Sequence, residues 1–494
     1  MPSYDCLVQL ELNQSDNLQR QIRQYLLQLI SSAHFMAKPL PSCRKMAKLL
    51  GVSRNTIVLV YESLVDDGYL QSRERSGFYV HEDIYKEGAA AFPVPQPQAH
   101  KPSIWGERLE KRTTMVQNIE KPSEWFRQPY PFIYGQIEQH YFPIQHWRAC
   151  SRVAQQRDGL KDWLDDYVDS DDPMLVEQIR QQLLSKRGIA CHSDEILITI
   201  GTQNSLYILA QLLVRKDSTF GIEEPGYTDA RNIFALAGAQ LQPLEIDAHG
   251  AKTNHMAGCD CVFLTPSHQV PTNITMSPDR RQAVLAQAKA HDFIIIEDDY
   301  ESEINSSHAP SPALKSLDSE GRVIYVSSLS KSLSPGLRLG FLVADRELVA
   351  EARALRRLMY RHPPSNNQRT AALFMAQGHY DSYLRGLRNK LADKAEVMRR
   401  GIQRHLNQCN IFGDTDGSSF WLQAPEFVDC ALLAKRALQA GIVIEAGAVH
   451  FHRKPAPRNF FRLGFAAIPI ERIDEGLEKL GQLIEDYRQL TLVS

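Results

Sequence analysis

The 494-residue chain lacks several features that would assign it to a compartment or a class of partner at once. Lysine and arginine total 56 against 58 aspartate and glutamate residues, and the net charge of -2 gives no sign of a strongly acidic or basic tail. No run of eighteen or more apolar residues exists that could cross a bilayer. The first residues also lack the pattern of a signal peptide. We therefore expect a cytoplasmic protein that does not enter a membrane.

Cysteines are few and scattered. Of the eight, only Cys259 and Cys261 lie close together, and they lack the Cys-x-x-Cys spacing of a zinc or redox site. Reduced thiols are the usual state in the cytosol. His450 and His452 form the other local pattern of possible ligands, and we interpret them as part of a loop at a substrate entrance. No metal is expected.

What the chain does contain is a lysine in unusual surroundings. An apolar stretch, residues 323–326, runs into Ser328, Ser330 and Lys331, and Arg338 follows seven positions later. An amine that attacks a carbonyl must be partly neutral, which favours cationic neighbours and limited hydration. A phosphate nearby would bind the Ser328 hydroxyl and the Arg338 guanidinium. Ser-x-x-Lys also opens ordinary surface helices, so this fragment alone leaves both interpretations open.

A second segment, residues 292–300, favours the cofactor interpretation. Its pattern is typical of a buried parallel strand that ends in three carboxylates and Tyr300. Open α/β sheets bind ligands at this end of their strands. A carboxylate such as Asp298 can keep a pyridine nitrogen protonated, while a tyrosine hydroxyl holds a phenolic oxygen. Strand-end acids alone are more often metal ligands or helix caps, but Lys331 follows in the next predicted strand-to-helix turn.

The first 85 residues have a helical pattern instead. Apolar residues at intervals of three and four predict three helices, of which the second and third are capped by Ser42 and Ser53. Residues 68–80 alternate around a turn, as in a two-stranded wing. The side chains expected to face the core are Leu18, Ile22, Tyr25, Leu26, Leu29, Ile30, Met46, Leu49, Leu50, Ile57, Val60, Tyr61, Leu64 and Val65.

Three helices followed by a wing are the arrangement of a winged helix-turn-helix, whose recognition helix places its first residues on base edges in the major groove. Residues 1–85 contain nine basic and nine acidic residues, so net charge does not decide the matter. Six of the nine basic residues, Arg75 of the wing among them, fall on the second helix, the third helix or the wing. A helical packing or dimerisation unit would have the same periodicity, but this placement favours DNA. A dimer that reads two half-sites is expected, because one module makes few phosphate contacts.

Residues 40–56 closely resemble the GntR family of DNA-binding proteins. The resemblance implies that the recognition surface contacts double-stranded DNA and that the wing lies near the backbone or the minor groove. The residues assigned in this way are Arg44, Ser53, Arg54 and Thr56 on the helices and Arg73 and Gly77 on the wing.

From about residue 130 to residue 490, the chain resembles the class I aminotransferases of fold type I, which use pyridoxal phosphate. Residues 198–206 resemble the turn at a helix N-terminus that holds the cofactor phosphate. Residues 223–227 resemble the segment that stacks an aromatic ring on the pyridine, and residues 265–272 occupy the place of Asn-Pro-x-Asn-Pro-Thr-Gly.

This resemblance implies a role for each matching residue. The implied contacts are Thr202, Gln203, Ser328 and Arg338 to the phosphate, Tyr227 to the pyridine face, Asp298 to the ring nitrogen, His268 and Tyr300 to the 3′ oxygen, and Lys331 as the Schiff-base lysine. Arg462 matches the arginine that holds a substrate α-carboxylate, so it favours an effector with a carboxylate or a sulfonate. Arg231 is a second candidate for an acidic group, although surface solvation is its expected role.

The chain departs from the aminotransferase pattern at three positions. His268 stands where an asparagine is usual, Leu175 replaces the glycine of an Asp-Pro-x-Gly pattern, and Asn273 replaces the glycine after Pro-Thr. We expect the core chemistry to survive these changes, whereas the substrate side is not taken to be that of an ordinary transaminase.

A GntR-like reader joined to an aminotransferase-like module is the architecture of the MocR, or GabR-type, family of bacterial transcription regulators, and the resemblance covers nearly the whole chain. We expect a multi-domain protein: an α+β winged helix-turn-helix over residues 1–85, an Ala-, Pro- and Gln-rich linker over 86–125, and an α/β module with a large and a small subdomain over 126–494. The resemblance implies a homodimer, pyridoxal 5′-phosphate as cofactor and an amino compound as effector. Aldimine formation by the effector would release Lys331 and reposition the readers on DNA.

Two other functions remain open from the sequence. A working aminotransferase with a DNA-binding extension would use Lys331 as its proton shuttle. A dedicated catalyst gains nothing from a recognition helix, so we expect regulation, with residual half-transamination at most. A sensor of pyridoxal phosphate alone would need no amino ligand.

Overall fold

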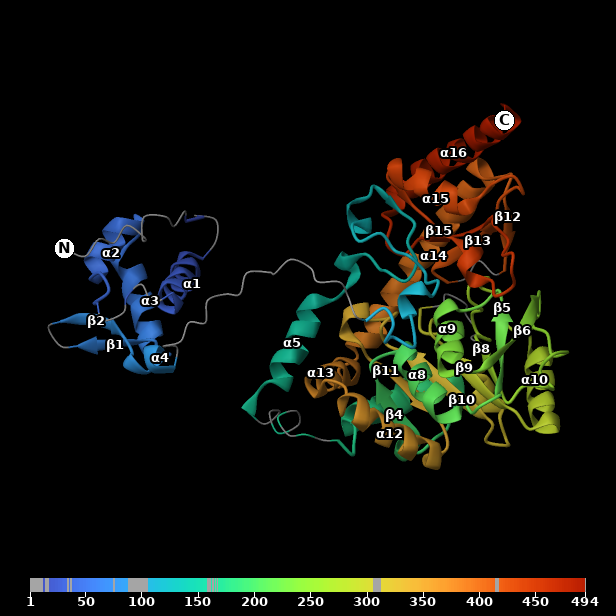
Figure 1. Cartoon of the computed structure of the whole chain (residues 1–494), viewed down its shortest axis with the longest axis horizontal. Helices are drawn as coiled ribbons and strands as arrows, with labels where there is room; N and C mark the ends of the chain where they lie inside the picture. Colours follow the sequence, from blue (N-terminus) through green and yellow to red (C-terminus); the bar gives the residue numbers. More distant parts are fainter. Residues whose placement is uncertain are drawn as a thin grey trace. The chain divides into compact units, whose positions relative to one another are not determined.

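The computed structural model describes residues 12–13, 17–32, 35, 38–73, 76–87, 105–157, 161, 164, 166, 168–304, 312–413 and 417–493. The chain divides into two compact units, Met1–Arg108 and Leu109–Ser494 (Figure 1). Residues 88–104 of the predicted linker and Arg75 of the predicted wing lie outside the described residues. No helix in the described ranges is both long and apolar enough to span a membrane.

The first unit contains the predicted three helices and two-stranded wing, followed by a short helix that the sequence pattern did not predict. Its elements are α1 (Leu18–Ser31), α2 (Cys43–Leu50), α3 (Arg54–Asp66), β1 (Leu70–Arg73), β2 (Gly77–Val80) and α4 (Glu82–Glu87). Both predicted N-caps are confirmed, because Ser42 Oγ accepts from Lys45 N at 3.4 Å and Ser53 Oγ accepts from Thr56 N at 3.1 Å. The two strands pair antiparallel, with Leu70 opposite Val80.

The core of this unit consists mainly of the residues predicted to face inward. Buried among them are Ile22, Leu26, Leu29, Ile30, Met46, Ile57, Val60, Tyr61 and Leu64. The prediction for Leu49 is wrong, because its side chain is 38% exposed while Ala47 is buried. At 100° per residue, the buried face of α2 is centred between Met46 and Ala47, so Leu49 falls outside it.

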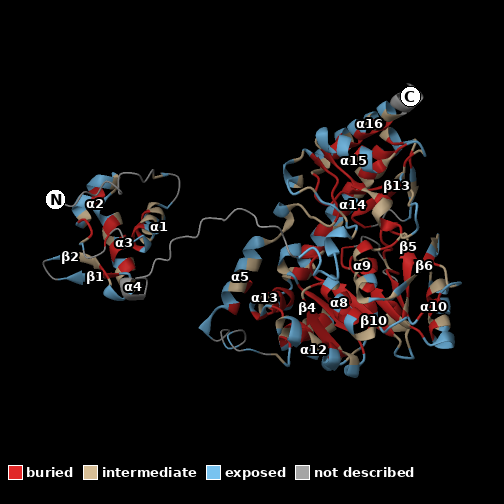
Figure 2. Cartoon of the chain, in the orientation of Figure 1, coloured by how far each residue is buried: buried red, intermediate tan, exposed pale blue. Residues whose placement is uncertain are grey.

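The second unit is built on an eight-stranded sheet in the order β4-β11-β10-β9-β8-β5-β6-β7. Its strands are β4 (Ile196–Thr199), β5 (Thr219–Glu224), β6 (Gln240–Asp247), β7 (Gly250–Ala251), β8 (Cys261–Leu264), β9 (Ile294–Asp298), β10 (Val323–Ser328) and β11 (Gly340–Val343). The neighbouring pairs from β10 to β6 are parallel, and β11 is antiparallel to both of its neighbours. Figure 2 shows these central strands as buried, which explains their nearly continuous apolar sequences.

Helices lie before, between and after the strands of this sheet in the sequence. They are α7 (Pro173–Gln178), α8 (Thr202–Leu213), α9 (Thr228–Ala237), α10 (Pro278–His291), α11 (Leu314–Leu317), α12 (Arg346–Tyr360) and α13 (Ser365–Ala376), with α5 (Ile144–Ala154) packed against α13. Leu175, the residue that replaces a glycine, is fully buried in α7. Asn273, which replaces the other glycine, adopts a left-handed φ of 64°, a conformation that asparagine tolerates better than most residues.

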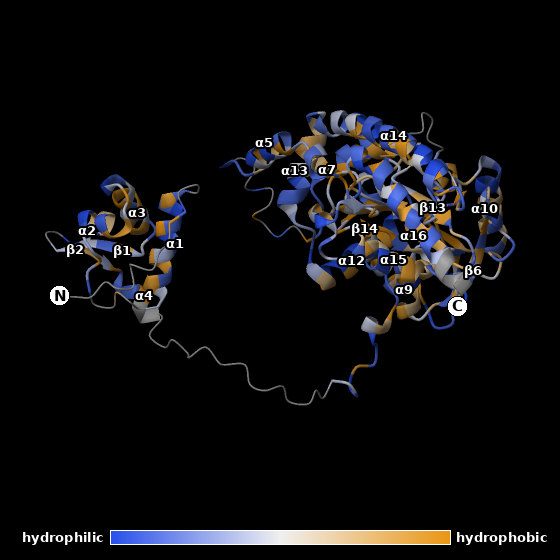
Figure 3. Cartoon of the chain, turned by 90° about the horizontal axis from the view of Figure 1, so that it is seen from above, coloured by the Kyte–Doolittle hydropathy of each residue, from blue (hydrophilic) through white to orange (hydrophobic). Residues whose placement is uncertain are grey.

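A smaller sheet follows the long helix α14 (His379–His405) and forms the predicted small subdomain. Its strand order is β12-β13-β16-β15, and α15 (Cys430–Gln439) and α16 (Ile473–Val493) complete this part of the chain. The strands are β12 (Asn410–Phe412), β13 (Ser419–Gln423), β15 (Glu445–Ala446) and β16 (Phe460–Gly464). Figure 3 shows hydrophilic and hydrophobic residues alternating along α14 and α16, as in amphipathic helices that cover a core. A separate parallel pair joins β3 (Tyr130–Pro131) to β14 (Ile442–Val443).

Candidate cofactor-binding site

The topology of the large sheet brings the predicted motifs to one edge. The parallel strands β9 and β10 pair with Asp298 opposite Val326, so the segments that follow them leave the sheet side by side. Strand β5 ends at the same edge and leads to Tyr227. Strand β4 is also parallel to β10, because β11 is antiparallel to both, and it leads to Gly201. The carboxyl ends of parallel strands are where sheets of this kind bind ligands.

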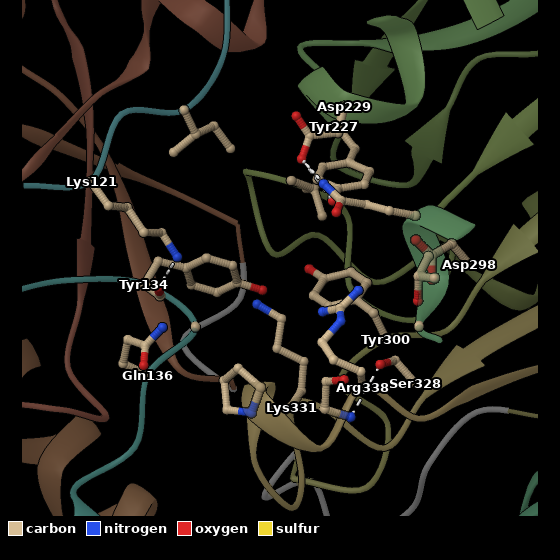
Figure 4. A pocket seen from close by; sticks show the side chains of 18 of the residues that line it. Lys121, Tyr134, Gln136, Tyr227, Asp229, Asp298, Tyr300, Ser328, Lys331 and Arg338 are labelled. Carbon is tan, nitrogen blue, oxygen red and sulfur yellow. Dashed lines mark hydrogen bonds between the residues drawn. The ribbon is translucent and has the colours of Figure 1, made fainter. Parts of the chain in front are cut away.

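A cavity of about 290 Å³ lies at this edge. It is lined by all but one of the residues predicted to bind the cofactor, together with Arg462: Thr202, Gln203, Tyr227, Asp298, Tyr300, Ser328, Lys331, Arg338 and Arg462. Figure 4 shows the Lys331 side chain between Tyr134 and Tyr300, with Arg338 and Ser328 beyond it. The structure therefore gathers residues that span 260 positions of the sequence, from 202 to 462.

One end of the cavity has the character of an anion site. Gly201, with a φ of 110°, precedes Thr202 at the N-terminus of α8, where free backbone N–H groups favour a phosphate. A Cβ at Gly201 would lie 3.0 Å from Arg338 Nη2, so glycine leaves room for the guanidinium. Thr202 Oγ1 and Ser330 Oγ are buried and have no hydrogen-bond partner among the described residues. A phosphate would supply acceptors for these hydroxyls and for Arg338.

The predicted strand-end carboxylates have separate roles. Glu297 accepts from the backbone N–H groups of Leu314 and Lys315 at 2.8 and 2.9 Å, and Asp299 accepts from Arg187 at 2.8 Å. Asp298 lines the cavity, and its Oδ1 has no partner among the residues that the structure describes. Burial, reinforced by Asp299, raises the pKa of Asp298 well above its ordinary value. A protonated ring nitrogen would supply a charged hydrogen-bond donor for this oxygen.

The surroundings of the Lys331 amino group favour its neutral, nucleophilic form. Burial lowers its pKa to about 8, an effect that Lys121 and Arg462 reinforce and Glu301 opposes. Its Nζ lies 4.1 Å from the centre of the Tyr134 ring. Gly135, with a φ of 73°, is required beside it because a Cβ there would overlap Lys331 Nζ. At neutral pH an appreciable fraction of this amine is unprotonated, as attack on an aldehyde demands.

These features fit pyridoxal phosphate. The unsatisfied hydroxyls of Thr202 and Ser330, the unpaired oxygen of Asp298 and the lysine of lowered pKa match its phosphate, its ring nitrogen and its aldehyde. Tyr227 lines the same cavity, and its hydroxyl donates to Asp229 at 3.2 Å.

His268 is the predicted cofactor residue that does not line the cavity. Its ring is buried, lies 3.4 Å from Glu301 Oε2 and fills the space beside Gly417. Its carbonyl oxygen accepts from the Tyr300 hydroxyl at 2.9 Å. Val270, two residues along the same loop, lines the cavity instead.

Arg462 lines the cavity and belongs to a buried cluster with Glu445 and His450. Its Nη2 lies 2.7 and 2.9 Å from the two Glu445 oxygens, and its Cζ lies 3.7 Å from the centre of the Tyr134 ring. His450 contacts Glu445 at 2.9 Å behind it, and its other ring nitrogen contacts Gly226 O at 3.0 Å. The interpretation of His450 as an entrance residue is therefore wrong, since its side chain is buried. Arg462 Nε has no hydrogen-bond partner within the described ranges.

Arg231 is also buried, and it donates to the carbonyl oxygen of Phe451 at 3.0 Å. The expectation of surface solvation is wrong. Arg231 begins the second turn of α9, and its side chain packs against the loop near residue 451.

Sequence reasoning missed several residues that line the cavity. They are Ile119, Lys121, Tyr134, Gly135, Gln136, Asp229, Val270, Ser330 and Pro335. Five of them, from Ile119 to Gln136, precede the first aminotransferase motif, and Ile119 and Lys121 fall inside the predicted linker. Among these nine, Asp229, Val270 and Ser330 carried a local signal, since each lies within two residues of an assigned position.

The residues assigned to DNA form a separate group in the first unit. Arg44 and Arg54 are exposed, on α2 and at the start of α3, and Ser53 and Thr56 share the cap of α3. Arg73 pairs with Glu82 at 3.0 Å and stacks over the Tyr79 ring at 4.5 Å. Gly77 has a φ of 106° and open space where a Cβ would stand.

Comparisons with known proteins match both units. The family model of "Aminotransferase class I and II" matches residues 140–480, and that of "Bacterial regulatory proteins, gntR family" matches residues 18–80. The HTH-type transcriptional regulator TauR of Rhodobacter capsulatus is 40% identical over 470 residues, which are 95% of this chain and 96% of that protein. The probable rhizopine catabolism regulatory protein MocR of Rhizobium meliloti is 30% identical over 471 residues, 94% and 93% of the two chains.

Among solved structures, the Pyrococcus horikoshii kynurenine aminotransferase has a TM-score of 0.70. It is 23% identical and covers 78% of this chain and 99% of its own. At this identity the likeness shows the fold alone, whereas the two relatives extend over both units.

Proposed function

The chain belongs to the MocR-type family of transcriptional regulators, in which a GntR reader is joined to an aminotransferase-like domain, and we propose that an amino compound controls its DNA binding through pyridoxal phosphate held at Lys331. The observation that carries this proposal is the cavity in which Lys331 of lowered pKa faces the unsatisfied polar atoms of Asp298, Thr202 and Ser330. The same chain carries a capped helix whose first turn exposes Arg54.

When bound, pyridoxal phosphate supplies an aldehyde that condenses reversibly with amines and a ring that withdraws electrons. Ser328, Thr202 and Arg338 would hold the phosphate, while Asp298 would keep the ring nitrogen protonated. Tyr227 and Tyr300 would orient the ring. Lys331 would carry the group until an effector amine competes for it.

Lys331 would then be bound to the cofactor in the absence of effector and released from it when the effector amine binds. Its amino group lies beside Tyr134 and near Lys121, so its release changes the charge and packing of the segment around residues 121–136. A ligand shifts a conformational equilibrium only through contacts that differ between the states. Reader domains of a homodimer, joined through residues 86–125, would respond to that shift.

The test combines DNA binding with cofactor absorbance on the full chain. An operator is first selected from random duplex DNA, and binding is measured by fluorescence anisotropy with the cofactor and a panel of amino acids and ω-amino acids. We expect one class of amine to shift both the absorbance and the operator affinity of the wild type, and Lys331→Ala to lose both responses. Operator affinity that no cofactor or amine alters in the wild type would contradict the proposal.

A working aminotransferase is the second candidate, because the lysine and the arginine needed for a half-reaction line one cavity. Sustained keto-acid production would favour it. The homodimer is checked separately by sedimentation, in which a monomer at micromolar concentration would contradict it.

A further inference from the structure

Four cationic side chains line the cavity: Lys121, Lys331, Arg338 and Arg462. Lys331 and Arg338 are assigned to the cofactor in the proposed function. Arg462 is matched by Glu445, so that pair contributes no net charge to the cavity. Lys121 is the cation that remains, and its Nζ donates to a neutral acceptor, the Tyr134 carbonyl oxygen, at 2.8 Å.

Lys121 is well placed for a ligand bound at the Lys331 position. The point where a Cβ would stand on Gly135 overlaps Lys331 Nζ and lies 3.6 Å from Lys121 Nζ, so the two amino groups flank the same glycine. Lys121 is exposed as a residue and also lines the cavity, so it lies where the cavity meets solvent. Figure 4 shows its side chain extending toward the backbone of Tyr134. An amine that takes the place of Lys331 therefore has its other end within reach of Lys121.

We propose that Lys121 binds the acidic group of the effector, a carboxylate or a sulfonate on a short amino compound. This rests on the proposed function, because the effector amine must compete with Lys331 for the cofactor. Arg462 alone binds an acid weakly while Glu445 neutralises it. Its Nε, which has no hydrogen-bond partner among the described residues, can still donate to the same acid. Lys121 supplies the positive charge that the acid needs.

The position of Lys121 in the chain gives this contact a second consequence. Lys111 Nζ donates to Leu236 O at 2.8 Å, and Asn232 Nδ2 donates to Gln117 O, also at 2.8 Å. Leu236 and Asn232 belong to α9, which begins directly after Tyr227. The segment that leads to the reader is thus hydrogen-bonded to α9 at residues 111 and 117, and it lines the cavity at Lys121. An effector acid bound by Lys121 would stabilise this segment. Effector binding would therefore be transmitted directly to the segment that connects the cavity to the DNA-binding unit.

The test uses Lys121→Met in the full chain loaded with pyridoxal phosphate. Glycine, β-alanine, 4-aminobutyrate and 2-aminoethanesulfonate are titrated against the alkylamines of the same length, with cofactor absorbance as the signal. We expect Lys121→Met to lower the affinity for the preferred acidic amine by at least about tenfold, and the affinity for the alkylamine of the same length by less than about twofold. Lys289→Met, which replaces an exposed lysine of α10 that pairs with Glu320 outside the cavity, is the matched control and is expected to titrate like the wild type.

Hydrogen exchange gives the second measurement. Protection of residues 105–121 is expected to rise when the acidic amine binds the wild type and not when it saturates Lys121→Met. Unchanged acid affinity in Lys121→Met, an equal loss for acid and alkylamine, or a wild type with no preference for acids would overturn the role of Lys121. A wild type without the cofactor band would refute the proposed function instead, so the two failures are distinct.

Discussion

Arg462 Nη2 lies 2.7 and 2.9 Å from the two oxygens of Glu445, and both side chains are buried. Although burial opposes it, the Arg462 guanidinium lowers the pKa of Glu445, so the carboxylate stays ionised. The arginine that the family resemblance assigned to an effector acid is therefore already paired with an acid of the chain itself. We expect this pairing to hold the affinity for an acidic effector below what an unpaired arginine would give.

Replacing Glu445 with Gln is expected to tighten the binding of acidic amines. The variant keeps a hydrogen-bond acceptor beside Arg462 and removes the competing negative charge, so we expect a gain of about tenfold, or about 1.4 kcal/mol, in cofactor-monitored titrations. Thermal unfolding should show a loss of stability, because a buried cation loses its partner. Glu396→Gln, in the pair with Arg400 on α14, is the control and should leave affinity unchanged. Equal affinities for Glu445→Gln and wild type would show that Glu445 does not compete.

Cofactor uptake by the cofactor-free protein should depend on pH through Lys331. The ordinary lysine pKa of 10.5 falls to about 8 by burial, so the neutral nucleophile accumulates as pH rises through 8 and levels off above about 9. Near pH 7 about a tenth of the amine is neutral, far more than for an unperturbed lysine. The rate of growth of the cofactor absorbance between pH 6 and 10 measures this. In Lys121→Met the midpoint should move to higher pH, because one neighbouring positive charge is gone. A rate still climbing steeply at pH 10 in the wild type would contradict the lowered pKa.

Gly201→Ala is expected to weaken pyridoxal phosphate binding by about tenfold or more. The new Cβ would lie 3.0 Å from Arg338 Nη2 and would sit on a backbone with a φ of 110°. The Arg338 guanidinium would have to shift away from the new methyl group, and we expect this shift to weaken its contact with a bound phosphate. Gly238→Ala is a matched control, because its φ of 106° imposes a similar backbone strain while its Cβ meets nothing within 4 Å. Equilibrium dialysis of the cofactor should separate the two variants, and equal losses in both would assign the effect to strain.

The sequence predicted those parts of the site that are local. The placement of Asp298 and Lys331 in one cavity could be predicted because Asp298 ends one apolar strand, Lys331 follows the next, and adjacent parallel strands end at one edge. The N-caps at Ser42 and Ser53 could also be predicted from the sequence, because an N-cap depends only on one side chain and the backbone N–H three residues later.

Other parts of the site depend on contacts between distant segments. Lys121 reaches the cavity from a segment whose Pro- and Gln-rich start indicated only a linker, and no spacing relates it to Lys331. The pairing of Glu445 with Arg462 arises from the antiparallel register of β15 and β16. The loop of residues 265–272 has no periodicity to say which of its residues faces the cavity, and Val270 lines it while His268 does not.

Arg54→Ala should weaken operator binding without changing stability. Arg54 is exposed at the first position of α3, where its guanidinium can reach a base edge or a phosphate. Among the described residues it forms no hydrogen bond or ion pair whose loss would destabilise α3. We expect a loss of about 1–3 kcal/mol if it contacts a base; if it contacts a phosphate, the slope of log K against log salt should fall by about 1. Anisotropy titrations at several salt concentrations distinguish these cases. Arg20→Ala, an exposed basic residue on α1 outside the predicted surface, is the control. Ser53→Ala provides the contrast, because loss of the α3 cap should cost about 1 kcal/mol of stability. If Arg20→Ala and Arg54→Ala weaken binding equally, α3 is not the recognition helix.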